Sequence, residues 1–171
     1  MGHVRAPHLV LPVGVEPSKL RMLHDARFLN LWNIDVPFKF EGLQSVPDLA
    51  GVGESGFSID HSSGYWHVAL TEDSYGFFGF EWEGVYYTYV VPSFGWKIAP
   101  MIYNSFSGKL AGFTRRLGMR SLCLLDDPIG LPLAPRRGPS PPLNPLEAAN
   151  SAAYVMVCLM VGLGYYVHPK K

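Results

Sequence analysis

The sequence is short of cysteine, of net charge and of long apolar runs. Two cysteines occur in 171 residues, Cys123 and Cys158. Both stand in apolar runs and nothing in their spacing indicates a disulfide, so we expect small buried side chains in a reducing compartment. Lysine plus arginine and aspartate plus glutamate number 14 each, so the net charge is zero. This argues against a dedicated nucleic-acid-binding module, which is normally basic, but allows an enzyme with a local basic groove and an acidic metal centre.

A membrane-spanning or secretory segment is also missing. The N-terminus lacks the apolar stretch of a secretory signal. The most apolar segment, 152–167, is shorter than the roughly 20 residues that cross a bilayer, so we expect a core helix. We therefore predict an intracellular protein, in the cytoplasm or nucleus, with no membrane partner. Because the chain ends directly after the strand-like segment 165–167, we also expect a truncated domain.

The apolar patterns predict an α+β fold with one core. Two aromatic runs, 77–82 and 85–90, are separated by Glu83 and Gly84, which is typical of a β-hairpin. Their aromatic side chains are expected to be core residues and cross-strand pairs. The other predicted elements are strands at 20–25, 57–60, 122–125 and 165–167, a short helix at 46–50, and longer helices at 98–117 and 146–163. Segment 128–145 contains seven prolines and is predicted to be a loop. We expect the helices to pack on one face of a mainly antiparallel sheet.

Carboxylates follow two of the predicted strands. Asp126 and Asp127 end the run 121–125, and Asp60 ends the run 56–59. Hard divalent cations prefer oxygen ligands. Two such ions side by side stabilise both the attacking and the leaving oxygen of a phosphoryl transfer. Taken alone, an Asp-Asp pair before a proline is more often a solvated turn.

Four segments resemble, in order and separation, the motifs of reverse transcriptases. Segment 59–68 (IDHSSGYWHV) is similar to the first catalytic motif of this family. Segment 94–100 (FGWKIAP) resembles the motif that contacts nucleotide and template. Segment 124–127 (LLDD) resembles the Tyr-x-Asp-Asp box, and 20–30 (LRMLHDARFLN) resembles the fingers strand that precedes these motifs. The resemblance covers roughly residues 14–171 and is nearest to retrotransposon enzymes of the Ty3 or DIRS type.

The resemblance implies a right-hand polymerase palm with partial fingers and no thumb. Residues 1–55 would be the lead-in and fingers, and 56–171 the palm with its Pro-rich loop at 128–145. The implied activity is RNA-directed DNA synthesis, in which dNTPs extend a primer on an RNA or DNA template. The implied cofactor is a pair of Mg²⁺ ions, or Mn²⁺ in their place. The oligomeric state stays open.

Residue roles carry over by position. The resemblance implies that Asp60, Asp126 and Asp127 are the metal ligands, with the backbone carbonyl of Ile59 or His61 beside them. It implies that Tyr65 is an aromatic gate that rejects a ribonucleotide 2′-hydroxyl by its bulk. Arg21 and Lys19 would hold the triphosphate. Phe94 and Gly95 would lie against the nucleotide and the template.

Three departures from the family pattern favour an alternative, a catalytically inactive or domesticated domain that binds nucleic acid or a protein partner. Leu124 replaces the aromatic residue of the Tyr-x-Asp-Asp box. The run from Pro92 to Gly95 is one residue longer than the usual Pro-x-Gly. Pro128 lacks the N–H that a returning hairpin strand needs, so a loop is expected there. A third hypothesis is a purely structural α+β domain.

Overall fold

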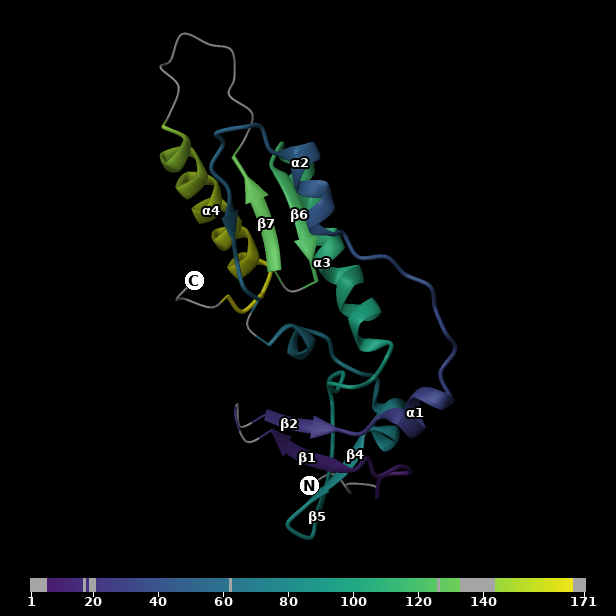
Figure 1. Cartoon of the computed structure of the whole chain (residues 1–171). Coiled ribbons are helices and arrows are strands. Elements are labelled where there is room, and N and C mark those ends of the chain that lie inside the picture. The colour runs from purple at the N-terminus through teal and green to yellow at the C-terminus, as the bar shows by residue number, and fades with distance from the viewer. Residues whose placement is uncertain are drawn as a thin grey trace. The chain divides into compact units, whose positions relative to one another are not determined.

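The structure, a computed structural model, describes residues 6–16, 18, 21–61, 63–125, 127–132 and 144–167 (Figure 1). The chain forms two compact units, each made from two separate stretches of sequence. The first unit combines residues 1–37 with 65–101, and the second combines 38–64 with 102–171. The expected division into fingers at 1–55 and palm at 56–171 stays a prediction.

The first unit contains two antiparallel strand pairs and short helical segments. β1 (Val13–Glu16) pairs with β2 (Arg21–His24), and β4 (Gly79–Trp82) pairs with β5 (Val85–Thr88). The short helix α1 (Arg27–Leu31) follows β2. The 3₁₀ segments are η2 (Gly64–His67), at the start of the second stretch, and η3 (Glu72–Phe77), which leads into β4. The buried core of this unit consists of Leu11, Ala26, Leu29 and Phe78.

The predicted hairpin is confirmed by β4 and β5. Its turn residues Glu83 and Gly84 have φ of 51° and 77°. Positive φ at both central residues is the type I′ geometry, which matches the twist of the two strands. Phe80 and Tyr87 stack across the hairpin with ring centroids 5.4 Å apart, as expected for a cross-strand pair. Tyr87 is nevertheless 45% exposed and Tyr86 55%, so these aromatic side chains are only partly core.

The second unit is a three-stranded antiparallel sheet with two long helices. The strand order is β3 (Phe57–Ser58), β7 (Asp127–Leu131), β6 (Arg120–Leu124). The helices are α3 (Ala99–Arg116) and α4 (Pro145–Gly162), and two short turns, η1 (Leu43–Ser45) and α2 (Val46–Leu49), precede β3. One buried cluster joins Ile59, which follows β3, to Leu110 of α3 and Met156 of α4. The predicted helices and the α+β class are therefore confirmed.

Helix α4 has the sequence pattern of a core helix. Asn144 accepts the Leu146 N–H at 3.0 Å and so caps its start, where Pro145 also fits. Its buried residues recur at helical spacing on one face: Ala149, Ala152, Met156 and Met160. With 18 residues and a mean hydropathy of 1.3, α4 is long and apolar enough to cross a membrane by length and composition alone, and 22% of it is buried within the structure.

Three expectations about the strands were wrong. The predicted loop at 128–145 begins with a strand, because β7 runs to Leu131; residues 133–143 lie outside the described part. The expected strand at 165–167 consists of a single bridge between Val167 and His61. The described strands also form three small sheets rather than one, because β1 with β2 and β4 with β5 each pair with their neighbour in sequence.

Candidate functional site

Asp127, the second acid of the predicted Asp-Asp pair, begins β7 in the hairpin of β6 and β7. Leu124 is paired with Asp127, and Leu125 directly follows β6. Leu125 has φ of 60°, as both turn types favoured in two-residue hairpins require at the first position. Asp126 itself lies outside the described residues.

The register of β3 with β7, extended two residues beyond the end of β3, places Asp60 opposite Asp127. Phe57 pairs with Gly130 and Ser58 with Ile129, and the Ile59 N–H donates to the Pro128 carbonyl at 3.0 Å. β3 itself ends at Ser58, and continuing its register past the Ile59 bond places Asp60 opposite Asp127. Residues directly opposite in an antiparallel pair have Cα atoms about 4.5–5.5 Å apart and side chains on the same face. Two of the three predicted acids thus come from segments 67 positions apart to one end of one sheet.

Both acids belong to the face of the sheet opposite the core. Ile59 is buried in the cluster with α3 and α4, and side chains alternate between faces along a strand. Asp60 and Asp127 therefore turn away from those helices. Asp60 is half-buried and Asp127 is exposed. A carboxylate pair that reaches solvent has the donor atoms that Mg²⁺ or Mn²⁺ prefers.

Pro128 is accommodated in β7, contrary to the expectation that it would replace the strand by a loop. Its partner in β6 is Cys123, whose N–H points to the outer edge of the sheet. In this register the nitrogen of Pro128 faces β3, so the missing N–H removes one hydrogen bond, the one to the Ile59 carbonyl. The Pro128 carbonyl still accepts from Ile59. The proline therefore removes one of the two hydrogen bonds of this residue pair, and the strand continues through it.

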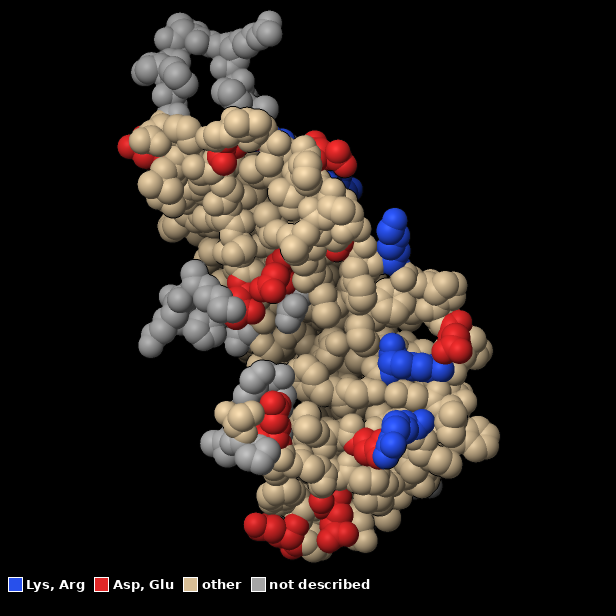
Figure 2. Space-filling view, viewed as in Figure 1, with Lys and Arg blue, Asp and Glu red and all other residues tan. Residues whose placement is uncertain are grey.

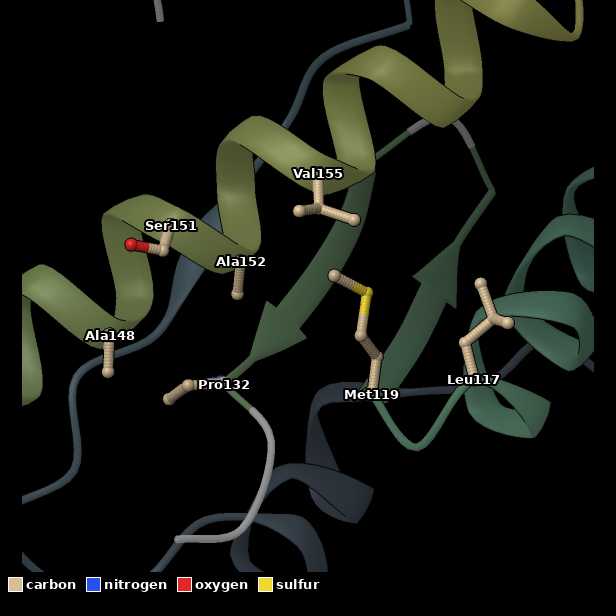
Figure 3. A pocket seen from close by; sticks show the side chains of 7 residues that line it. All are labelled: Leu117, Met119, Pro132, Ala148, Ser151, Ala152 and Val155. Carbon is tan, nitrogen blue, oxygen red and sulfur yellow. The ribbon is translucent and has the colours of Figure 1, made fainter. Parts of the chain in front are cut away.

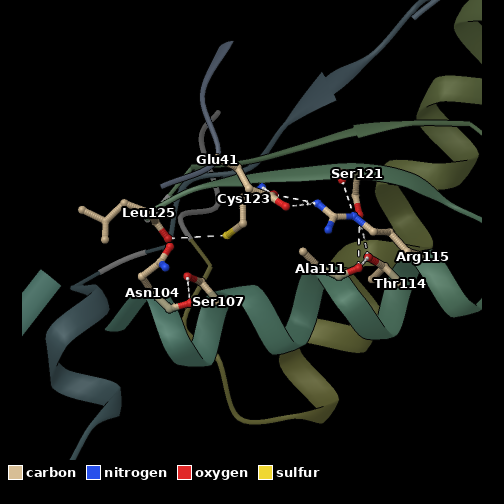
Figure 4. A network of polar contacts seen from close by, with 9 residues as sticks. All are labelled: Glu41, Asn104, Ser107, Ala111, Thr114, Arg115, Ser121, Cys123 and Leu125. Carbon is tan, nitrogen blue, oxygen red and sulfur yellow. Dashed lines mark hydrogen bonds and ion pairs between the residues drawn. The ribbon is translucent and has the colours of Figure 1, made fainter. Parts of the chain in front are cut away.

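The outer edge of β6 is held by two charged side chains that sequence reasoning missed (Figure 4). The Glu41 carboxylate accepts the Cys123 N–H at 2.8 Å. Arg115 of α3 donates from Nη2 to both Glu41 oxygens at 2.6 Å and from Nε to the Ser121 carbonyl at 2.8 Å. The buried hydroxyls of Thr114 and Ser121 are hydrogen-bonded at 2.8 Å. These contacts connect α3 to the strand that leads into the Asp-Asp turn.

In the first unit, two predicted substrate-binding residues from different motifs lie together. The rings of Tyr65 and Phe94 have centroids 5.1 Å apart and are tilted by 50°. Phe94 is 48% exposed and Tyr65 is half-buried, so the pair presents an accessible aromatic surface. The extra residue in the run from Pro92 to Gly95 does not prevent this contact.

The backbone conformation at position 95 requires a glycine. Its φ is 93°, and a Cβ at this position would lie 2.7 Å from the His24 carbonyl oxygen. Asn30 donates from Nδ2 to the Gly95 carbonyl and accepts the Lys97 N–H with Oδ1, both at 2.9 Å. Asn30 thereby fixes the loop that carries Phe94. Its role was not predicted, because one asparagine within a short helix carries no distinct signal.

The two predicted phosphate-binding residues are placed only in part. Arg21 lies in β2 opposite Glu16, and its side chain is not described. Lys19 lies outside the described residues. Within the parts of the chain that the structure describes, no three His, Cys, Asp or Glu side chains form a metal-binding group. Asp60 and Asp127 supply two donors, and Asp126, the predicted third, is not among the described residues.

The face drawn in Figure 2 and the described apolar pocket show no second cluster of chemically active side chains among the described residues. On the face in Figure 2, described lysine and arginine side chains stand singly among acidic and uncharged ones. A pocket of about 250 Å³ lies where β6 begins and β7 ends, at the opposite end of these strands from the acids (Figure 3). Side chains from α4, including Ala152 and Val155, face Met119 across it. Among the described residues of its lining Ser151 is the one polar side chain, and none of them is an acid or a base.

The fold is similar to that of solved viral polymerases. No family model and no curated protein sequence matches the chain. Native prototype foamy virus protease-reverse transcriptase matches with a TM-score of 0.71 and 19% identity, over 98% of this chain and 21% of that chain. The foamy viral enzyme in complex with an RNA/DNA hybrid matches with a TM-score of 0.73 and 18% identity, over 98% and 21%. The chain has a reverse transcriptase-like fold.

The matched enzymes are much longer than this chain. The foamy viral enzyme in complex with dsDNA matches with a TM-score of 0.71 and 18% identity, over 95% of this chain and 32% of that chain. The chain therefore spans between a fifth and a third of the structures that it resembles. At these identities the likeness concerns the fold.

Proposed function

We propose that this chain is an RNA-directed DNA polymerase domain of a retroelement, of the Ty3 or DIRS type, with a palm and partial fingers. The observation that carries the proposal is the ladder of β3 and β7, which, continued past the Ile59 bond to Pro128, places Asp60 opposite Asp127. Carboxylates meeting at one sheet end, in a reverse transcriptase-like fold, suit nucleotidyl transfer. The solved complexes with RNA/DNA hybrid and dsDNA support a primed template as the partner.

The proposal assigns a role to each predicted site residue. Asp60, Asp126 and Asp127 hold two divalent ions, which supply a lowered pKa at the primer 3′-hydroxyl and charge neutralisation at the triphosphate. Tyr65, supported by Phe94, lies under the sugar of the incoming dNTP and excludes a 2′-hydroxyl by its bulk. Gly95 lets the backbone approach the nucleotide and template. Arg21 and Lys19 hold the triphosphate oxygens as hydrogen-bond donors.

Primer extension by the full chain tests this proposal. With a primed RNA template, dNTPs and Mg²⁺, the chain is expected to incorporate nucleotides, and chelation of the metal stops the reaction. Asp60→Asn replaces a charged carboxylate ligand by a neutral amide of similar volume. It should lower the rate at least about a thousandfold, as expected for loss of several kcal/mol of transition-state stabilisation. Asp48→Asn changes an exposed acid of α2 and should leave the rate unchanged. Equal rates for both variants would exclude the assignment.

The second candidate is a domain of the same fold that binds nucleic acid or a protein without chemistry. Leu124 favours it, because an aliphatic side chain pairs with Asp127 where the family carries an aromatic one. A gel shift with primed template, combined with no nucleotide incorporation in Mg²⁺ or Mn²⁺, would identify this candidate.

A further inference from the structure

His61, the residue directly after Asp60, lies in the interior of the second unit. Its ring is 2% exposed, and Nδ1 is hydrogen-bonded to the hydroxyl of Tyr103 on α3. Tyr103 is 1% exposed. Removing one partner of a buried hydrogen bond costs about 1–3 kcal/mol, so this pair strongly favours one position of the His61 ring.

Three further contacts surround this pair. The Tyr165 ring lies 5.1 Å from the His61 ring, and the His61 backbone forms a bridge with Val167. A Cβ at Gly64 would lie 2.7 Å from Tyr103 Cζ, so the absence of a side chain at Gly64 lets the Tyr103 ring pack closely. The chain that carries Asp60 is thus attached to α3 and to the segment after α4.

The sheet alone holds Asp60 weakly. β3 has two residues, and its last ladder bond is the one from Ile59 to the Pro128 carbonyl. Because Pro128 has no N–H, the return bond to the Ile59 carbonyl cannot form. The contacts of His61, on the other side of Asp60, add to the hold of this short ladder on the chain.

We propose that Tyr103 is a positioning residue that acts through His61 to hold Asp60 opposite Asp127. Only the consequence for metal binding rests on the proposed function; the anchoring itself does not. Tyr103→Phe removes one hydroxyl and keeps the ring. Ser107→Ala is the matched control, since Ser107 is fully buried one turn further along α3 and its hydroxyl donates to the Tyr103 carbonyl.

Amide hydrogen exchange of segment 57–64 in the full chain tests the anchor. Tyr103→Phe should raise its exchange rate roughly tenfold, and Ser107→Ala should leave it near the wild-type rate. If Tyr103→Phe does not fold, His61→Leu and His61→Asn give the same test. Leucine loses the hydrogen bond, whereas the asparagine amide offers both a donor and an acceptor near the position of Nδ1 and should restore slow exchange. Unchanged exchange in Tyr103→Phe or His61→Leu, or no rescue by His61→Asn, would overturn the proposal.

Mn²⁺ binding, followed by electron paramagnetic resonance, separates this inference from the proposed function. Tyr103→Phe should weaken Mn²⁺ binding roughly tenfold relative to Ser107→Ala, through misplacement of Asp60. A wild-type chain that binds no Mn²⁺, together with faster exchange in Tyr103→Phe, supports the anchor and rejects the metal site. Normal Mn²⁺ affinity in a Tyr103→Phe variant whose exchange is raised would show that Tyr103 is structural and would overturn its positioning role.

Discussion

The carboxylate of Glu41 accepts the backbone N–H of Cys123 at 2.8 Å, although 82 positions separate the two residues. β6 is the outer strand of its sheet, so this N–H would otherwise point out of an open edge. Unpaired edges invite pairing with other chains. Glu41 covers the edge next to the Asp-Asp turn, and Arg115 fixes the carboxylate in place.

Loss of the Glu41 contact at the edge of β6 should destabilise the hairpin of β6 and β7. We expect Glu41→Ala to lower the free energy of unfolding by about 1–2 kcal/mol, because a charge-assisted bond to a strand N–H disappears while the partly exposed ion pair adds little. Glu41→Gln keeps an acceptor and should lose less. Urea denaturation followed by circular dichroism measures both. A smaller loss for Glu41→Ala than for Glu41→Gln would contradict this explanation.

Backbone strain at the turn leads to a second prediction. Leu125 has φ of 60°, a region that asparagine tolerates and β-branched residues avoid. The side chain of residue 125 is half-buried, and this burial would favour valine over asparagine. The backbone and side-chain effects therefore predict opposite orders of stability for the two variants. We expect Leu125→Asn to unfold at higher urea concentration than Leu125→Val. The reverse order would show that side-chain burial outweighs the turn geometry.

Local patterns allowed much of the fold to be predicted. The hairpin of β4 and β5 depends on two residues between two β-branched and aromatic runs, and a turn is a local structure. α3 was predicted within about one residue, because Pro100 fits its first turn and Arg115 and Arg116 fit its last. The register of Asp60 with Asp127 could be anticipated only from the family resemblance, since no local signal specifies which distant strands pair.

The errors arise where tertiary structure, rather than local sequence, decides the outcome. The effect of Pro128 depends on which neighbouring strand its nitrogen faces, and tertiary structure decides this. The same holds for Glu41 and Arg115, which resemble ordinary surface charges in the sequence. His61 and Tyr103, 42 positions apart, could not be matched without the structure either.

A third prediction concerns Gly130, which lies opposite Phe57 in the sheet. A Cβ on Gly130 would lie 2.2 Å from Phe57 Cζ. We expect Gly130→Ala to destabilise the second unit by about 1–3 kcal/mol, as is usual for overpacking. Adding Phe57→Leu, which shortens the opposing side chain, should recover part of the loss. Gly108→Ala is the control: it adds a methyl group in open space on α3 and should stabilise the helix by about 1 kcal/mol. Thermal unfolding of the three variants checks this order.

The contact between Tyr65 and Phe94 leads to a fourth prediction, which rests on the proposed function. If Tyr65 excludes the 2′-hydroxyl, its ring needs support, and the Phe94 ring lies 5.1 Å away. Tyr65→Val should raise incorporation of ribonucleotides relative to deoxynucleotides by at least about tenfold, and Phe94→Ala should act in the same direction with a smaller effect. The ratio of kcat/KM for the two nucleotide classes is the measurement. An unchanged ratio in Phe94→Ala would mean that Tyr65 keeps its position without this contact.

His24 should make the stability of the first unit depend on pH. Burial lowers its pKa below the ordinary 6.5, and the rings of Phe80 and Tyr89 pack edge-on against it. The nearby carboxyl of Asp25 and hydroxyl of Tyr89 do not titrate between pH 5.5 and pH 7.5. Hydrogen bonds from Arg27 lower the pKa of Asp25 to about 2, and burial raises that of Tyr89.

Between the folded-state pKa and 6.5 the unfolded chain therefore holds a proton on His24 that the folded chain lacks. Stability is then fully present above 6.5 and falls as the pH drops below that value. We expect the free energy of unfolding, measured by urea denaturation, to decrease from pH 7.5 to pH 5.5 in the wild type. His24→Phe, which keeps a ring in the same packing, should remove part of this decrease, whereas replacing the exposed His8 by phenylalanine should not. Equal slopes in the wild type and His24→Phe would mean that His24 is protonated in the folded state without cost, which its apolar surroundings oppose.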